Sequence, residues 1–234
     1  MEFVSAFTTA IGMVADVDPA LMAIIALSLR VTLSAVFLAA LIGLPLGALL
    51  AVSRFPGRAL LVVAINALMG LPPVVVGLAI YLMLSRSGPL GGLGWLFTPP
   101  AMILAQFVLV LPIVVALTRQ SLEDLWGEYR EHLLSLGQSG WQVVPTLLWE
   151  GRFSLATALL AGFGRASAEV GAVLIVGGNI AGYTRTMTTA IALETSKGDL
   201  PLALGLGLVL LLLTLVINAA AFGASRIGAR FMGA

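Results

Sequence analysis

Long apolar stretches separated by short polar connections dominate the chain. Five of them last for roughly 20 residues or more, which is the length that a helix needs to cross the hydrocarbon core of a bilayer: 31–52, 60–84, 99–118, 153–177 and 202–223. None of them alternates polar and apolar residues with the period of two that is typical of barrel strands. The pattern therefore predicts an all-α integral membrane protein with five transmembrane helices.

The N-terminal segment 1–29 leaves a sixth transmembrane helix open. Residues 20–29 are apolar and would make the first stretch longer than the bilayer is thick, so we expect this segment to begin along the membrane interface. Asp16 and Asp18 interrupt the preceding apolar residues, and no positively charged region comes before them, so we expect no cleaved signal peptide. Since the sequence shows no linker or repeat, residues 1–234 are predicted to form a single transmembrane domain.

The composition supports a membrane protein and excludes several functions. Only 10% of the residues are charged, against about 25% in soluble domains. A net charge of +1 leaves no basic surface for nucleic acid. The chain has no cysteine and only one histidine, His132, so we expect no metal site and no cofactor. Phosphate-binding loops and intramembrane protease motifs are also missing, so the chain is not expected to be an enzyme or to hydrolyse ATP itself.

The placement of lysine and arginine predicts the orientation, because positive charge collects on the cytoplasmic side. With five helices and the N-terminus outside, three basic residues fall outside, namely Arg86, Arg185 and Lys197, and seven fall inside: Arg54, Arg58, Arg119, Arg130, Arg152, Arg226 and Arg230. The reverse topology inverts this bias. We therefore expect a cytoplasmic C-terminus, with the long connection 119–152 inside and the connection 179–200 outside.

The inner connection contains Glu131-His132-Leu133, then three residues, then Gly137. This spacing resembles the EAA loop of ABC-importer permeases, in which Glu-Ala-Ala-x-x-x-Gly forms a short coupling helix, a turn at glycine and a return into the membrane. His132 and Leu133 replace the two alanines, and Leu147–Glu150 replace the later Ile-x-Leu-Pro of the family.

Other stretches between about residues 25 and 225 extend the resemblance. They are similar to permeases of type I ABC importers, and most closely to the tungstate branch of the tungstate/molybdate oxyanion family. The matching stretches are Ser28–Val31 through Gly43–Gly47, the double-proline stretch Gly70–Gly77, Gly162–Ala172, Gly177–Ile180 and Thr184–Glu194.

The resemblance implies a fold, a function and a set of partners. The fold would be the MetI-like fold of type I importer permeases, and the function would be ATP-driven import of tungstate, or a related oxyanion such as molybdate, across a bacterial cytoplasmic membrane. The partners would be a second copy of the chain, two ABC ATPase subunits, an external substrate-binding protein and membrane lipid. Contact with the ATPase would fall on Glu128, Arg130, Glu131, His132, Leu133 and Gly137.

Two features inside predicted helices are candidates for the translocation path or its gate. Arg165 and Glu169 lie four residues apart, which places them on one face of the predicted helix. Charges within a membrane must be paired or face a cavity, so the two residues either line the path or fix packing through an ion pair. Pro72 and Pro73 remove backbone donors and should bend their helix.

The outer connection offers hydroxyl groups around one cation. Thr184, Thr186, Thr188 and Thr189 surround Arg185 in the sequence, a set that suits the hydrogen-bond-accepting oxygens of a doubly charged anion. A contact with the binding protein, or an ordinary solvated loop, would have the same composition.

The main alternative is a secondary transporter of a small anion that works without an ATPase partner. Prolines and a charged pair near the middle of helices also suit ion coupling. This alternative predicts inverted repeats, which the sequence does not show, and it gives no role to the EAA-like loop.

Overall fold

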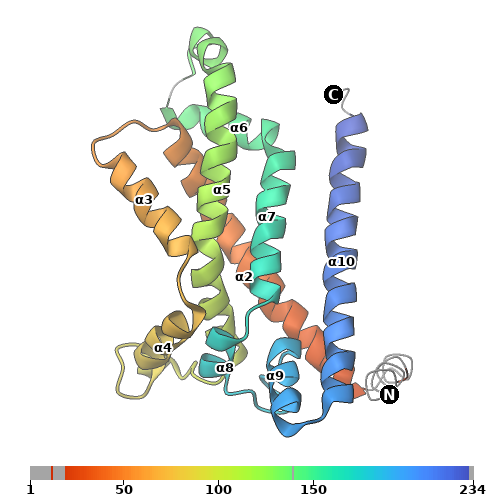
Figure 1. The fold of residues 1–234 in the computed structure, drawn as a ribbon. Coiled ribbons are helices and arrows are strands. Elements are labelled where there is room, and N and C mark those ends of the chain that lie inside the picture. The colour runs from red at the N-terminus through yellow and green to blue at the C-terminus, as the bar shows by residue number, and fades with distance from the viewer. Residues whose placement is uncertain (1–11, 13–18, 139, 232–234) are drawn as a thin grey trace. The chain divides into compact units, whose positions relative to one another are not determined.

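The computed structural model describes residue 12, residues 19–138 and residues 140–231, and over these ranges all regular structure is helical. The all-α prediction is confirmed for this part of the chain. In chain order the helices of Figure 1 are α2 (Pro19–Val52), α3 (Arg58–Met69), α4 (Pro73–Leu84), the short 3₁₀ helix η1 (Gly91–Leu93), α5 (Pro99–Ser135), the 3₁₀ helix η2 (Gly140–Val143), α6 (Val144–Glu150), α7 (Arg152–Ser167), α8 (Gly171–Gly177), α9 (Met187–Lys197) and α10 (Leu200–Phe231).

Three described helices are long and apolar enough to cross a membrane as single segments: Leu21–Val52 of α2, all of α5, and Leu200–Ala220 of α10. The pairs α3/α4 and α7/α8 also qualify if each bent pair counts as one span. The chain therefore has three to five candidate membrane spans among the described residues. The predictions 60–84 and 153–177 are wrong as continuous helices, because both stretches contain a break.

The first break follows from glycine and proline. Helix α3 ends at Gly70, Pro72 is extended with φ −64° and ψ 121°, and Pro73 is the first residue of α4. Proline fits the first turn of a helix, where its missing N–H would have no partner, but it interrupts a helix interior. The predicted disturbance at Pro72 and Pro73 is confirmed, although the chain ends one helix and starts another where a kink was expected.

The second break lies between Arg165 and Glu169. Helix α7 ends at Ser167, so Arg165 lies in its last turn, and Glu169 follows it outside helical structure. The Glu169 Oε1 accepts the backbone N–H of Ala172, at 2.9 Å, at the start of α8. The prediction that the two residues share one face of a continuous helix is therefore wrong, because the carboxylate caps a new helix.

Two helices extend beyond their predicted bounds. Helix α2 begins at Pro19 and not at residue 31, and α5 continues to Ser135 and not to residue 118. Hydropathy marks where a helix leaves the apolar medium, whereas the helix itself continues until a residue stops it. Residues 20–29, whose start was expected along the interface, belong to α2, whereas residues 1–11 and 13–18, which bear on a sixth helix, lie outside the described residues.

The chain divides into two compact units. The first contains the described residues up to Ser34 together with Pro72–Gln106 and Ala166–Ala219. The second contains Ala35–Leu71, Phe107–Arg165 and the described residues from Ala220 onward. Each unit is assembled from separate chain segments, so no single cut in the sequence separates them.

Helices α4 and α8 pack against each other in the first unit, and glycine permits the contact (Figure 1). A Cβ atom on Gly77 would lie 2.7 Å from the Cα atom of Ala172, closer than real Cβ contacts. Small residues allow helix backbones to approach in this way in membranes. The stretch Gly70–Gly77 therefore supplies both the break before α4 and its closest contact with α8.

The second unit has a core that ties the connection after α5 to the helices around it. Its members come from the end of α2, the later part of α5, η2, α6 and the start of α7: Ala48, Ala51, Leu122, Leu133, Val143, Val144, Leu147 and Leu155. The connection predicted as a loop over 119–152 is thus largely helical and packed.

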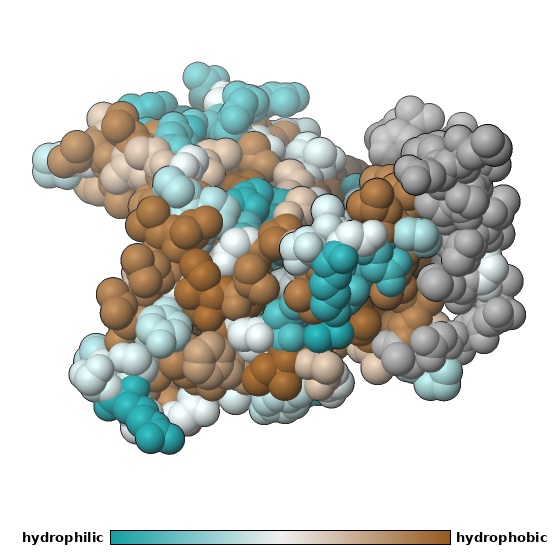
Figure 2. All heavy atoms as spheres, turned by 60° about the horizontal axis from the view of Figure 1, so that its bottom comes forward, coloured by the Kyte–Doolittle hydropathy of each residue, from teal (hydrophilic) through white to brown (hydrophobic). Residues whose placement is uncertain are grey.

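Large apolar side chains remain exposed on many helices. Phe37 of α2, Leu60 of α3 and Leu211 of α10 are 65%, 75% and 69% exposed. Figure 2 shows the same property on one face, where hydrophobic residues occupy broad areas and hydrophilic residues gather in limited ones. Such surfaces are found where a protein meets lipid or another protein.

Candidate coupling and translocation sites

The EAA-like spacing forms the end of α5 and a tight turn. Gly137 has φ +76°, its N–H donates to the Leu134 carbonyl, and the Gln138 N–H donates to the Leu133 carbonyl. This pair of bonds is the Schellman arrangement that ends helices at a left-handed glycine. The expected turn at Gly137 is confirmed. The expected separate short helix is wrong, because α5 continues without interruption from Pro99 to Ser135.

Most of the predicted coupling residues are exposed, and one is not. Glu128, Arg130, Glu131 and His132 lie on the surface of the last turns of α5. Leu133 is buried in the core of the second unit. The buried Leu133 side chain therefore anchors the end of α5 in the core, and its exposed neighbours remain available for contacts with another protein.

Apolar side chains that the sequence did not single out complete this surface. Leu134, Leu136, Trp141 and Trp149 are all exposed, with Trp141 at 74%. Together with the four exposed polar residues of α5 they form what we term the hairpin surface. Tryptophans within an otherwise polar connection are the sequence signal for such a surface, since large aromatic side chains are enriched where proteins dock.

The first unit brings predicted site residues from three distant segments together. The Thr188 hydroxyl, at the start of α9, donates to the backbone carbonyl of Glu169 at 2.8 Å. A Cβ atom on Gly171 would lie 3.0 Å from Cγ2 of Val74, the second residue of α4. The start of α4 after Pro72 and Pro73, the break at Glu169 and the start of α9 are therefore neighbours. We call this group the break site.

Glu169 gives the break site its electrostatic character. Its side chain is only 3% exposed, and its carboxylate lies at the first turn of α8. A negative charge is favourable at a helix N-terminus because the free N–H groups there carry partial positive charge. The Glu169 carboxylate occupies this favourable position at the first turn of α8.

The threonines of the predicted outer loop are used mainly for local structure. The connection 179–200 contains helix α9, which the sequence did not predict. Thr184 is buried, and its hydroxyl donates to the Gly177 carbonyl at 2.6 Å while accepting the Ile180 N–H at 2.9 Å. Thr186 and Thr189 form a capping box at the start of α9. These hydroxyls satisfy the backbone, a role that a loop composition alone does not reveal.

Arg185 has a different environment from the threonines beside it. It lines a cavity of about 190 Å³ with Leu21, Ile24, Ala190, Glu194, Leu202 and Leu206. Its buried Nε has no hydrogen-bond partner among the described residues. Glu194, on the same cavity, accepts a bond from Lys197 Nζ at 2.9 Å. The cation therefore faces a mostly apolar cavity.

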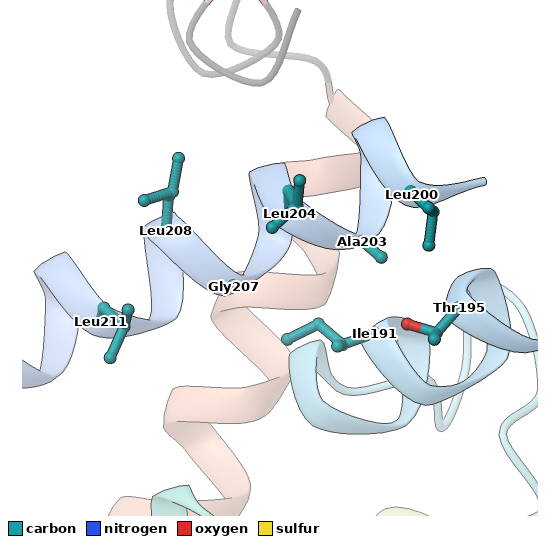
Figure 3. A pocket seen from close by; sticks show the side chains of 8 residues that line it. All are labelled: Ile191, Thr195, Leu200, Ala203, Leu204, Gly207, Leu208 and Leu211. Carbon is teal, nitrogen blue, oxygen red and sulfur yellow. The ribbon is translucent and has the colours of Figure 1, made fainter. Parts of the chain in front are cut away.

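The groove between α9 and α10 is apolar and unsuited to an anion. It has a volume of about 430 Å³, and Figure 3 shows Ile191 and Thr195 of α9 opposite the leucine-rich start of α10. Among the described residues that line it, Thr195 is the one polar residue and none is a cation. Among the described residues, no group of three or more histidine, cysteine, aspartate or glutamate side chains is placed to hold a metal ion.

Comparison with known proteins explains this combination of features. Residues 43–232 match the family described as "Binding-protein-dependent transport system inner membrane component". The chain is 42% identical over 216 residues to a probable anion ABC transporter permease protein of Haloferax volcanii, covering 90% of each chain.

Two further relatives belong to named oxyanion systems. The tungstate uptake system permease protein TupB of Peptoclostridium acidaminophilum is 40% identical over 220 residues, which is 94% of this chain and 96% of that protein. The molybdenum transport system permease protein ModB of Haemophilus influenzae is 31% identical over 173 residues, 70% of this chain and 76% of that one. The chain therefore belongs to the inner-membrane components of binding-protein-dependent transport systems, the permease subunits of ABC transporters, and is a multi-pass membrane protein that works with an ATPase and a binding protein.

Proposed function

We propose that this chain is the permease of an ATP-driven importer for tungstate, with molybdate as a related substrate. The proposal of tungstate as substrate is based on the tungstate permease that matches 94% of the chain. The proposal of molybdate is based on the shorter match to the molybdenum permease. Membership of the permease family also argues against the alternative hypothesis, a secondary transporter that works without an ATPase.

The break site supports a place on the translocation path for Pro72, Pro73 and Glu169. Non-helical backbone within a membrane protein is tolerated where it is buried in protein or lines a watery cavity. Each break lies inside one helix pair, α3/α4 or α7/α8, and each pair qualifies as a membrane span only when its two helices are taken together. Arg165, in the turn that precedes the second break, is proposed to belong to the same path.

The hairpin surface carries the proposal that ATP hydrolysis moves this protein. It combines charged residues with exposed tryptophan and leucine on a helix end that Leu133 anchors in the core. A rigid, mixed polar and apolar helix end suits a groove on a partner protein. We assign the ATPase contact to Glu128, Arg130, Glu131, His132 and the turn at Gly137.

The proposed assembly has two copies of this chain, two ATPase subunits on the cytoplasmic side and one binding protein outside. The positive-inside bias supports a cytoplasmic hairpin surface and C-terminus. The second copy is supported by α10, because only 17% of its apolar window is buried. In this orientation the connection with Thr184, Arg185, Thr186, Thr188 and Thr189 faces outside, towards the binding protein.

Substituting Gly137 by valine should uncouple transport. A β-branched residue is strained at φ +76°, at a cost of about 1–2 kcal/mol or more, so the turn and the hairpin surface should rearrange. We expect tungstate uptake in vesicles that contain the full transporter to fall at least tenfold, and less ATPase to copurify.

The matched control is Gly127→Ala, in α5 ten residues before Gly137, where an added Cβ meets nothing within 4 Å. It should keep uptake and copurification near wild type. Wild-type uptake by a correctly folded Gly137→Val protein would contradict the proposed coupling role.

A further inference from the structure

A basic cavity lies in the second unit where α2, α3 and α5 meet. Its volume is about 320 Å³, and its lining consists of Ala51, Ser53, Arg54, Arg58, Glu123, Trp126, Gly127 and Arg130. Glu123 supplies the only carboxylate among the described lining residues, and this carboxylate accepts bonds from both Arg58 and Arg119. Three lining arginines, Arg54, Arg58 and Arg130, against one lining glutamate give the cavity a net positive charge.

An apolar groove is lined by the same three helices. It has a volume of about 450 Å³, and all of its lining side chains are apolar: Leu46, Leu50, Leu61, Ile65, Leu68, Leu71, Val108, Leu111, Pro112 and Val115. Arg58 Nε donates to the backbone carbonyl of Leu50 at 2.9 Å. Since Leu50 lines the groove and Arg58 lines the basic cavity, the two spaces adjoin along this bond.

The order of the lining residues matches the dimensions of one lipid leaflet. Along α5 the groove lies at residues such as Leu111 and the basic cavity at residues such as Trp126. These two residues are fifteen positions apart, which corresponds to about 22 Å of helix. A bilayer with its headgroup regions is about 40–45 Å thick, so half of it has the same length.

We propose that this junction binds one anionic phospholipid, with its phosphate among Arg54, Arg58 and Arg130 and an acyl chain in the groove. Basic cavities at the end of apolar grooves between membrane helices suit acidic headgroups. Arginine binds phosphate oxygens through paired N–H groups, and Trp126 lies at the level where amphipathic rings gather in membranes. A protein partner would have to fill the groove with apolar side chains and also present an acidic side chain to the arginines. The inference depends only on the chain spanning a membrane, and not on the transported substrate.

Native mass spectrometry of the full chain tests the headgroup. The protein is released from nanodiscs that contain equal phosphatidylglycerol and phosphatidylcholine. We expect wild type to retain phosphatidylglycerol at least fivefold more often. The double variant Arg54→Gln/Arg130→Gln, which leaves the Arg58–Glu123 pair in place, should retain the two lipids about equally. The control Arg86→Gln removes an exposed cation elsewhere and should behave like wild type.

The groove has its own matched pair of variants. Leu61→Trp should fill the groove and lower the retention of both lipids, whereas Leu60→Trp, on an exposed position of the same helix outside the groove, should not.

Equal retention of the two lipids by wild type would overturn the proposal. Displacement of the lipids by inorganic phosphate alone would also overturn it, because that result would indicate a site for free anions. The chain has no cysteine of its own. A single cysteine introduced by Leu61→Cys can therefore test by disulfide formation whether a second copy of the chain occupies the groove. A disulfide between two copies at this position would overturn the proposal as well.

Discussion

Replacing Gly77 by leucine should abolish transport and loosen the first unit. A Cβ atom at this position would lie 2.7 Å from the Cα atom of Ala172, and backbone atoms cannot move aside as a flexible side chain can. Overpacking costs typically about 1–3 kcal/mol, and a contact with backbone lies at the upper end of that range or beyond it. Because α4 and α8 both begin at the break site, separating them should also displace the proposed path. Uptake of tungstate by vesicles and the melting temperature of the purified protein measure the two effects.

A graded pair of variants separates this contact from a general intolerance of glycine substitutions. Gly77→Ala should lower the melting temperature and uptake in part. Gly164→Ala places its Cβ where nothing lies within 4 Å and should leave the melting temperature unchanged. If Gly77→Leu were as stable and as active as wild type, the α4–α8 packing described here would be incorrect.

The second large effect is expected at Glu169. Alanine at this position removes the oxygen that accepts the Ala172 N–H and leaves the site of a buried carboxylate empty. An unsatisfied buried backbone group costs about 1–3 kcal/mol. We expect Glu169→Ala to lower the melting temperature of the purified permease and to reduce uptake about tenfold.

Glutamine distinguishes the hydrogen bond from the charge at this position. Glu169→Gln keeps an oxygen that can accept the Ala172 N–H, so it should retain at least half of the uptake and most of the stability. If the glutamine variant were as stable as wild type but as inactive as alanine, the negative charge itself would be required for transport. The capping role would then not account for the residue.

The membrane class and the approximate helix positions followed from the sequence because burial in lipid demands long apolar stretches. The turn at Gly137 could also be predicted, since a resemblance to the EAA loop placed a glycine where the chain must reverse. The break at Pro72 and Pro73 was expected for a similar reason. Two adjacent prolines after a glycine end a helix here, whereas the single prolines Pro45 and Pro112 lie inside α2 and α5.

Other features depended on contacts that a linear pattern does not contain. Arg165 and Glu169 have helical spacing, yet α7 ends between them, and the carboxylate of Glu169 accepts a bond at the start of α8. The threonines near Arg185 looked like ligands for an anion because a sequence does not show which hydroxyls the backbone uses. Leu133 was grouped with its exposed neighbours, although its side chain points into the core. In each case the residue type can serve several roles, and packing in the folded protein decided which one it serves.

The most direct measurement is accumulation of tungstate in liposomes that contain the purified permease, its ATPase and external binding protein. Enclosed ATP should drive accumulation above the outside concentration. Replacing ATP by an analogue that cannot be hydrolysed, or omitting the ATPase, should reduce uptake to background. Uphill accumulation by this chain alone, without the ATPase subunit, would contradict the account.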